Sequence, residues 1–334
     1  MSKNVEVNEG EWRLTGAVAA EEAMACPVCG GNARPCWTAI DGKGRGWPYV
    51  RCQNCGLVRL DLRGIVEEWK KLAYGDEYYA EGISKFTGAV QLLREFSAWR
   101  RAREIHGFFG VPGRVLDIGC GEGLFLKAMQ NFGWQVDGCE TGQRPAERAE
   151  QLLGRPVCRG GFCGMLESGV AGPWDVVMLW HVLEHVAEPR ELLERLAGFM
   201  KPGGRLVVAV PNAASWQARI FGVYWFHLDP PRHLYHLEEK HVRMISRDAG
   251  WEIDGCRHFS LEYGPFGWAQ SFLNVCHWRR DAMYETLKRS KGIVKGGIGW
   301  RALAWLLLGP SVLPAALEAM AGRGGSLALF MKRK

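Results

Sequence analysis

The sequence has no apolar run suited to crossing a bilayer. The uncharged stretch 302–317 has 16 residues and is interrupted by Gly309, Pro310 and Pro314, whereas a spanning helix needs about 20 apolar residues. Residues 1–22 are polar and acidic, without the apolar segment of a signal peptide. We therefore expect residues 1–22 to be a flexible tail and the protein to be cytoplasmic.

The sequence also lacks a strong charge imbalance and a disulfide framework. Its net charge is +6, from 42 Lys and Arg against 36 Asp and Glu, and the basic residues form no continuous tract. This balance predicts no nucleic-acid partner, although it suits an anionic substrate or surface. The cysteine count of 11 is odd. Four cysteines form two C-x-x-C pairs and the others are scattered, which indicates a metal site and free thiols.

The two cysteine pairs predict a zinc ribbon over residues 23–61. Each pair is followed by glycine, which lets backbone amides turn toward the thiolates, and four sulfur ligands suit tetrahedral zinc. The predicted ligands are Cys26, Cys29, Cys52 and Cys55. With four sulfur ligands the metal has no open position for water, so we expect Zn²⁺ to be structural. A role in recognising substrate is the alternative.

Residues 115–125 combine a buried strand, a glycine turn and the start of a helix. Such a unit binds a nucleotide or nucleoside at the start of a doubly wound sheet. The glycines are at 119, 121 and 123, so the dinucleotide spacing G-x-G-x-x-G fails at Leu124. Asp117 at the end of the strand would repel a pyrophosphate but could accept a hydrogen bond from a ligand ammonium. Glu140, at the end of the next strand, could bind two ribose hydroxyls.

Alternating apolar segments predict seven strands and the helices between them. The expected strands are 114–118, 134–139, 156–158, 174–180, 205–210, 251–259 and 326–331, with a turn at 201–204.

Several phrases together resemble the class I methyltransferases that use S-adenosylmethionine. They are D-x-G-x-G-x-G from Asp117, D-V-V-x-x-x-H-V-L-E-H-V from Asp175, K-P-G-G at 201–204 and V-P-N at 210–212. The likeness spans about 111–259. The cysteine knuckles, with the phrase R-C-x-N-C-G-L from Arg51, extend it to bacterial small-molecule methyltransferases that carry an amino-terminal zinc ribbon.

The resemblance implies a fold and a domain order. The expected fold is α/β, a Rossmann-like seven-stranded doubly wound sheet with a small amino-terminal zinc ribbon and a helical insert between strands 6 and 7. The ribbon would be followed by a helical linker or cap, 62–110, and by the methyltransferase domain, 111–334, with the insert at 262–324. Tyr78 and Tyr79 of the cap could line the cofactor mouth. The cap's arginines suit either a solvated face or an anionic substrate.

The resemblance also implies S-adenosylmethionine as cofactor. The implied contacts are Asp117, Gly119, Cys120, Gly121, Gly123, Glu140, Phe162, Trp180 and His181. One position departs from the family pattern, because no acidic or amide side chain follows the third strand. Phe162 could stack on the adenine instead.

The implied reaction is methyl transfer to a small-molecule acceptor, with O-methylation of a lipid-linked or sugar-like compound as the first choice. The proposed base is His181 or His233, and the other catalytic candidates are His236 and Tyr235; their alternative role is purely structural. A sugar C-methyltransferase and a non-catalytic zinc-ribbon binding protein are the alternative functions. A nucleic-acid N-methyltransferase would favour N/D-P-P-Y/F after strand 4, where this chain has residues 181–184, H-V-L-E.

The insert combines a basic stretch with an apolar one. Residues 279–308 contain seven Lys and Arg, six before Trp300 and the seventh at Arg301, and the apolar residues Trp300, Leu303, Trp305, Leu306, Leu307 and Leu308. This order suits peripheral contact with an anionic inner-membrane surface. A lid packed on the core or a dimer contact is the other interpretation.

Overall fold

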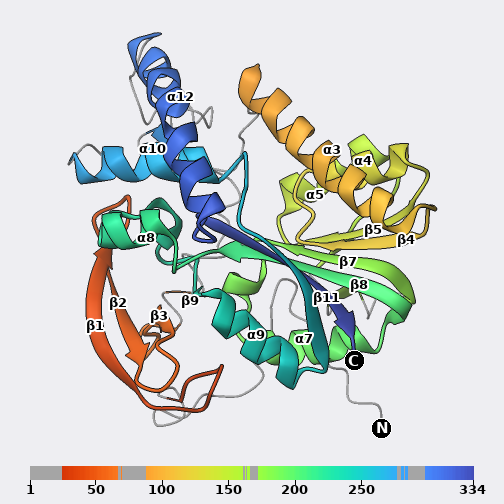
Figure 1. Ribbon diagram of the computed structural model, residues 1–334, viewed down its shortest axis with the longest axis horizontal. Coiled ribbons are helices and arrows are strands. Elements are labelled where there is room, and N and C mark those ends of the chain that lie inside the picture. The colour runs from red at the N-terminus through yellow and green to blue at the C-terminus, as the bar shows by residue number, and fades with distance from the viewer. Residues whose placement is uncertain are drawn as a thin grey trace, which may run out of the picture.

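The computed structural model describes residues 25–66, 69, 88–160, 162, 164–165, 172–276, 280–281, 283–284 and 298–334, without the side chains of residue 89 and residues 298–305 (Figure 1). The expected tail at 1–22, Tyr78 and Tyr79 lie outside these residues. So does most of the basic stretch in the insert.

A seven-stranded sheet forms the centre of the protein, in the order β10-β11-β8-β7-β4-β5-β6. Its strands β4 to β8 are parallel and β11 runs antiparallel to both of its neighbours. The strands are β4 Arg114–Ile118, β5 Gln135–Glu140, β6 Cys158–Arg159, β7 Trp174–Trp180, β8 Met200–Pro211, β10 Trp251–Arg257 and β11 Ser326–Arg333. The expected Rossmann-like α/β sheet, with its antiparallel last strand, is confirmed.

Helices cover both faces of this sheet (Figure 1). On one face α3 Ala89–Phe109, α4 Leu124–Asn131 and α5 Gln143–Leu153 pack around Val115, Val136 and Val176. On the other face α7 Pro189–Ala197 and α9 Glu239–Asp248 pack around Leu116, Ile118 and Val208. Successive strand residues point to opposite faces, so a strand buried on both sides is apolar throughout.

The strand β8 begins five residues earlier than expected. Residues 201–204 were expected to be a turn, but they continue the strand from Met200. Met200 pairs with Trp174, and a register shift follows between Trp174 and Val176. Lys201 Nζ bonds to Asp175 Oδ2 at 2.7 Å. Residues 201–204 lie between the paired residues Met200 and Arg205 and have no partner of their own in either neighbouring strand, and Gly203 has φ +77°, so Pro-Gly-Gly forms a bulge within β8.

The amino-terminal segment forms a second sheet that uses a strand from the second half of the chain. Strands β1 Ala33–Ile40, β2 Gly46–Cys52 and β3 Val58–Leu60 are antiparallel, and β3 also pairs with β9 Tyr235–His236. Figure 1 shows this sheet beside α8 Trp216–Phe221. The expected ribbon is therefore not an isolated sheet, because its fourth strand lies some 175 residues further along the chain.

The insert between β10 and β11 contains α10 Gly264–Val275 and α12 Ile298–Met320. Pro310 and Pro314 were expected to interrupt the apolar run, but both lie inside α12. The carboxyl end of α12 is fixed to the core. Glu318 is fully buried and accepts hydrogen bonds from Gln217 Nε2 at 2.7 Å and from the Gly325 amide at 3.0 Å. Of the helices in the described part of the chain, none is long and apolar enough to span a membrane.

Candidate active site

The site is built where β4 and β7 end side by side. Ile118 of β4 pairs with Leu179 of β7, so the residues after both strands emerge at one edge of the sheet. The glycine loop after β4 leads into α4. Gly121 has φ +55°, and a Cβ added there would meet no described atom within 4 Å. The loop therefore leaves open space at its tip, as close approach of a ligand to the backbone requires.

Asp117 is the buried acid of the site. Its Oδ1 has no hydrogen-bond partner among the described residues. Burial raises the pKa of this carboxyl to about 7, with a smaller increase from Glu140 and an opposing effect from Arg101. A buried, unpartnered carboxyl fits a cationic ligand group, because an ammonium would both pair with it and favour its charged form.

Glu140 lies across the glycine loop from Asp117 and accepts hydrogen bonds from two backbone amides. Oε2 accepts from the Gly121 amide at 2.9 Å and Oε1 from the Gly142 amide at 2.8 Å. Thr141 Oγ1 also donates to Oε1, at 3.5 Å. An ionised carboxylate has about four acceptor positions, so about one remains for a ribose hydroxyl unless the long Thr141 contact gives way. Burial raises the pKa of Glu140. The loop and Glu140 thus form one hydrogen-bonded unit that fits a nucleoside.

Trp180 and Arg101 form one wall beside this unit. The guanidinium of Arg101 lies 4.4 Å from the Trp180 ring centroid, and Arg101 Nη1 reaches Glu262 Oε2 at 3.5 Å. Trp180 Nε1 is buried without a partner in the part of the chain that the structure describes. Arg101 comes from the arginine-rich helix α3, so one of those arginines faces the site rather than solvent.

Two predicted cofactor residues lie apart from any open surface. Phe162 is fully buried and packs edge-on against Phe199 with ring centroids 5.9 Å apart, which leaves no free face for adenine. Cys120 is 8% exposed, and its amide bonds to the Cys139 carbonyl at 3.1 Å. Cys120 therefore shapes the loop through its backbone. The stacking role of Phe162 gains no support from this geometry.

His181 follows β7 directly and adopts φ +55°, which is uncommon for a residue other than glycine. Its Nδ1 lies 3.2 Å from Glu184 Oε1 and its Nε2 lies 3.4 Å from Ser326 Oγ. The ring packs on Tyr263 of the insert, with centroids 4.1 Å apart. Burial would raise the pKa of Glu184, but the His181 hydrogen bond and the charges of nearby histidines lower it to about 2. Glu184 therefore stays ionised and orients the His181 imidazole through this hydrogen bond.

The loop of residues 225–236 brings further histidines to the same edge. His233 Nε2 lies 3.9 Å from Glu184 Oε1 and 3.7 Å from Asp229 Oδ2. His236 is buried between the ribbon and the loop, 5.2 Å from the Tyr49 ring centroid. Tyr235 Oη donates to the Ala187 carbonyl at 2.6 Å, and burial raises the pKa of its hydroxyl. His181 and His233 therefore converge on Glu184, whereas Tyr235 is engaged by the backbone.

Three residues at the site were not predicted from the sequence: Glu184, His185 and Arg101. Glu184 is fully buried, which is exceptional for a carboxylate. A signal was present, since an acid three residues after a histidine at a strand tip can fold back onto that ring. The loop that carries His233, the other histidine beside Glu184, however, lies about fifty residues further along the chain.

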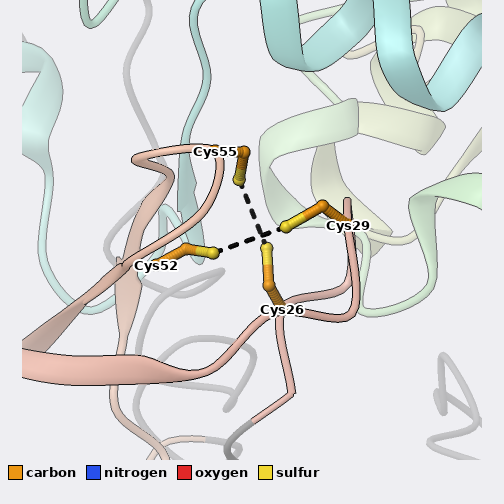
Figure 2. Close-up of side chains that lie close together, drawn as sticks. All are labelled: Cys26, Cys29, Cys52 and Cys55. Atoms are coloured by element: carbon orange, nitrogen blue, oxygen red, sulfur yellow. Dashed lines mark hydrogen bonds between the residues drawn. The ribbon is translucent and has the colours of Figure 1, made fainter.

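The four knuckle cysteines converge on one point (Figure 2). Cys26 Sγ lies 3.6 Å from Cys55 Sγ, and Cys29 Sγ lies 3.4 Å from Cys52 Sγ. Four sulfurs around a tetrahedral zinc with bonds of about 2.3 Å would be about 3.8 Å apart. Burial opposes ionisation of these thiols and raises the pKa of Cys26 and Cys55, whereas for Cys52 the amides of Cys55 and Asn54 outweigh burial and lower the pKa to about 7. The geometry and the donor set both fit zinc.

Comparisons with known proteins identify the family of the chain. The family described as Methyltransferase domain matches residues 90–254. A ubiquinone biosynthesis O-methyltransferase of Caulobacter sp. (strain K31) is 32% identical over 217 residues, 58% of this chain and 77% of that relative. Its counterpart in Maricaulis maris is 32% identical over 163 residues, 43% of this chain and 64% of that relative. The chain belongs to the S-adenosylmethionine-dependent methyltransferases and is an enzyme of that class.

Among solved structures, an S-adenosylmethionine-dependent methyltransferase from Archaeoglobus fulgidus is similar to this chain. It is 18% identical with a TM-score of 0.44, and the match covers 80% of this chain and all of that one.

Proposed function

We propose that the enzyme transfers the methyl group of S-adenosylmethionine to a hydroxyl oxygen of a small-molecule acceptor, with His181 as the base. The observation that carries this proposal is the pairing of His181 with the buried Glu184, 3.2 Å apart, at the strand tip beside the glycine loop. The O-methyltransferase names of the relatives support the oxygen as the methylated atom.

Asp117, Gly121 and Glu140 would hold the cofactor. The unpartnered Asp117 Oδ1 is suited to the ammonium of the methionine part, and Glu140 to the ribose hydroxyls. When bound, S-adenosylmethionine supplies an electrophilic methyl group on a sulfonium. The protein's contribution is to position the acceptor and to remove its proton.

His181 would accept the proton of the acceptor hydroxyl at Nε2. Glu184 fixes the tautomer, because a carboxylate at Nδ1 requires that nitrogen to carry the proton and leaves Nε2 as the acceptor. The ionised Glu184 also stabilises the imidazolium that forms. This arrangement uses the carboxylate as an orienting group, as in a Ser-His-Asp triad.

We also propose that Cys26, Cys29, Cys52 and Cys55 bind one structural zinc ion. The metal would stabilise the sheet that pairs β3 with β9, and it would thereby hold His236 in place. His241 Nε2 lies 3.1 Å from the Cys55 carbonyl, so α9 also contacts the cysteine knuckle. The ribbon is in this view part of the acceptor side of the enzyme.

The peripheral membrane contact expected for 279–308 remains a proposal. Of its apolar residues, Leu306 is 70% exposed, and Leu313 nearby on α12 is 65% exposed. An anionic vesicle should retain the protein at low salt and release it at high salt, because the basic stretch is screened. A protein that stays in the supernatant at every salt concentration would identify the insert as a lid or a dimer contact.

Methyl transfer is tested with S-adenosylmethionine carrying ¹³C in its methyl group and a panel of phenols, catechols and sugars. We expect a labelled product whose carbon resonance is that of a methyl ether, formed about 100-fold more slowly by the His181→Asn variant. A resonance typical of a methyl group bound to carbon would instead indicate that the enzyme methylates carbon. Absence of product with all acceptors, despite cofactor binding, would exclude these substrate classes.

A further inference from the structure

A second group of metal-binding side chains lies where α9 begins and β10 ends, and it shares no residue with the four-cysteine cluster. Glu239, Cys256 and His258 each place one possible ligand atom within 4.8 Å of the others. Cys256 Sγ lies 3.4 Å from His258 Nε2, and His258 Nε2 lies 3.7 Å from Glu239 Oε2. Tetrahedral zinc with bonds of about 2.0–2.3 Å holds such atoms about 3.4–3.6 Å apart. These two spacings are therefore close to those around a zinc ion.

The uncommitted atoms of His258 and Glu239 face each other. His258 Nδ1 has no hydrogen-bond partner among the described residues, whereas Nε2 lies beside both the thiol and the carboxylate. Arg243 Nε and Nη2 lie 2.7 and 2.6 Å from Glu239 Oε1, which leaves Oε2 for a ligand. Carboxylates that bind metals are commonly fixed in this way by an outer hydrogen-bonding neighbour.

The group is partly enclosed. The side chains of His258 and Glu239 are 18% and 35% exposed, and Cys256 is half-buried. The turn after α12 lies close by, since a Cβ added at Gly322 would be 3.9 Å from His258 Nε2. Such a site gives an ion access from solvent and leaves room for water as the fourth ligand of a tetrahedral ion.

Two arginines and the proton of the thiol oppose a cation at this place. Arg243 lies close enough to Cys256, and Arg323 to His258, for their charges to act on these groups. Burial raises the pKa of the Cys256 thiol, so coordination has to release its proton. Once ionised, the thiolate and the Glu239 carboxylate together neutralise the two charges of a divalent ion. We therefore expect the group to bind a metal more weakly than the four-cysteine cluster does.

We propose that Glu239, Cys256 and His258 bind a zinc ion of their own, with water in the fourth position. A thiolate, an imidazole and a carboxylate are all zinc ligands in proteins, whereas Mg²⁺ and Ca²⁺ prefer oxygen ligands. The thiolate and the imidazole therefore select a transition-type metal over these two ions. The open fourth position distinguishes this site from the closed four-sulfur cluster.

The ion would join two segments of the acceptor side. Helix α9 follows the loop of residues 225–236, and His258 lies five residues before Tyr263, which packs on His181. A metal bridge from the start of α9 to the end of β10 would hold the beginning of the insert in place beside that loop. This positioning role rests on the proposed function, whereas the binding of the ion does not.

The test is titration of the zinc-loaded protein with Co²⁺, followed by absorption spectroscopy and elemental analysis. We expect one Co²⁺ per chain in addition to the zinc of the cysteine cluster, with visible ligand-field bands and the near-ultraviolet absorption of a single thiolate. Exchange of Co²⁺ into the cysteine cluster would instead release zinc and give the absorption of four thiolates. The two sites are thereby distinguished in one titration.

Three variants define the ligands. Glu239→Gln, Cys256→Ser and His258→Gln should each weaken Co²⁺ binding about tenfold or more, since even the outer neighbours of metal ligands contribute that much. Cys256→Ser should also remove the thiolate absorption. Cys276→Ser, at an exposed cysteine outside the group, should bind Co²⁺ as the wild type does. Circular dichroism and binding of S-adenosylhomocysteine, measured in parallel, report folding and the cofactor site.

Three results would overturn this site. The first is folded wild-type protein that takes up no Co²⁺ beyond exchange into the cysteine cluster. The second is Co²⁺ binding without thiolate absorption, and the third is binding that is unchanged in all three ligand variants. Each of these results concerns metal uptake alone and leaves the methyl-transfer proposal intact.

Discussion

The two sides of the active-site edge are built in different ways. The cofactor side uses one continuous unit, β4, the glycine loop, α4 and β5, in which Glu140 bonds to the Gly121 amide. The acceptor side joins the tip of β7, the loop of residues 225–236, the insert and the amino-terminal ribbon. A short local motif thus fixes one half of the chemistry, whereas long-range packing assembles the other half. We therefore expect damage to the acceptor side to spare cofactor binding.

The largest effect should come from removing the ribbon's metal. A Cys29→Ser, Cys52→Ser variant lacks two of the four sulfur ligands and should therefore lose about one zinc per chain. The effect should be large because structural zinc contributes on the order of 10 kcal/mol to the folding of small zinc domains. β9 would then lose its pairing partner β3, and we expect protease cleavage in the ribbon and loss of methyl transfer. Elemental analysis, limited proteolysis and the ¹³C-methyl assay measure the three effects.

The matched control for the zinc variant is Cys36→Ser. Cys36 lies on β1 and its thiol contacts the Tyr49 carbonyl at 3.3 Å, outside the metal cluster. This variant should keep the zinc and the activity. If the zinc-free protein lost S-adenosylhomocysteine affinity as completely as it lost activity, the two sides of the site would not be separable.

A smaller effect is expected from His181→Asn. Asparagine tolerates the left-handed backbone at this position, and loss of a general base costs about 100-fold or more in rate. Turnover should therefore fall by about that factor while S-adenosylhomocysteine binds as before. His106→Asn, on α3 and stacked on Phe132, is the control. Turnover within about threefold of wild type would exclude His181 as the base.

The sequence predicted the cofactor side closely because its elements are local. The bounds of β4 agree with the expectation to the residue, and those of β5 are shifted by one residue. The ribbon's pairing with β9 could not be predicted, because strand pairing across about 175 residues leaves no periodic signal. The burial of Glu184 and its contact with His233 likewise depend on the loop of residues 225–236 folding back.

The smallest predicted effect is a pH dependence on the cofactor side. Asp117 has a pKa raised to about 7 by burial, against about 3.9 for an exposed aspartate. A ligand ammonium favours the ionised form, so affinity for S-adenosylhomocysteine should fall by up to tenfold per unit as the pH drops below about 7. The free energy of unfolding of the ligand-free protein should show the opposite trend. The stability supplied by the protonated Asp117 is lost as the pH rises through 7.

Asp117→Asn serves as the reference for this titration. Its amide has no charge to gain, so the variant should bind more weakly at pH 8 and show a flatter profile. A wild-type affinity that is constant between pH 5 and pH 8 would contradict the assignment of Asp117 to the ammonium.

The central claim, that the glycine loop and Glu140 form the cofactor site, is tested most directly by calorimetry with S-adenosylhomocysteine. Wild-type protein should bind one molecule per chain. Glu140→Ala should bind at least tenfold more weakly, since a charge-assisted contact contributes roughly 1.5–3 kcal/mol. Gly121→Arg should abolish binding by filling the open space at the loop tip, while Glu147→Ala, on the surface of α5, should have no effect. Unchanged binding in both the Glu140 and the Gly121 variants would contradict the account.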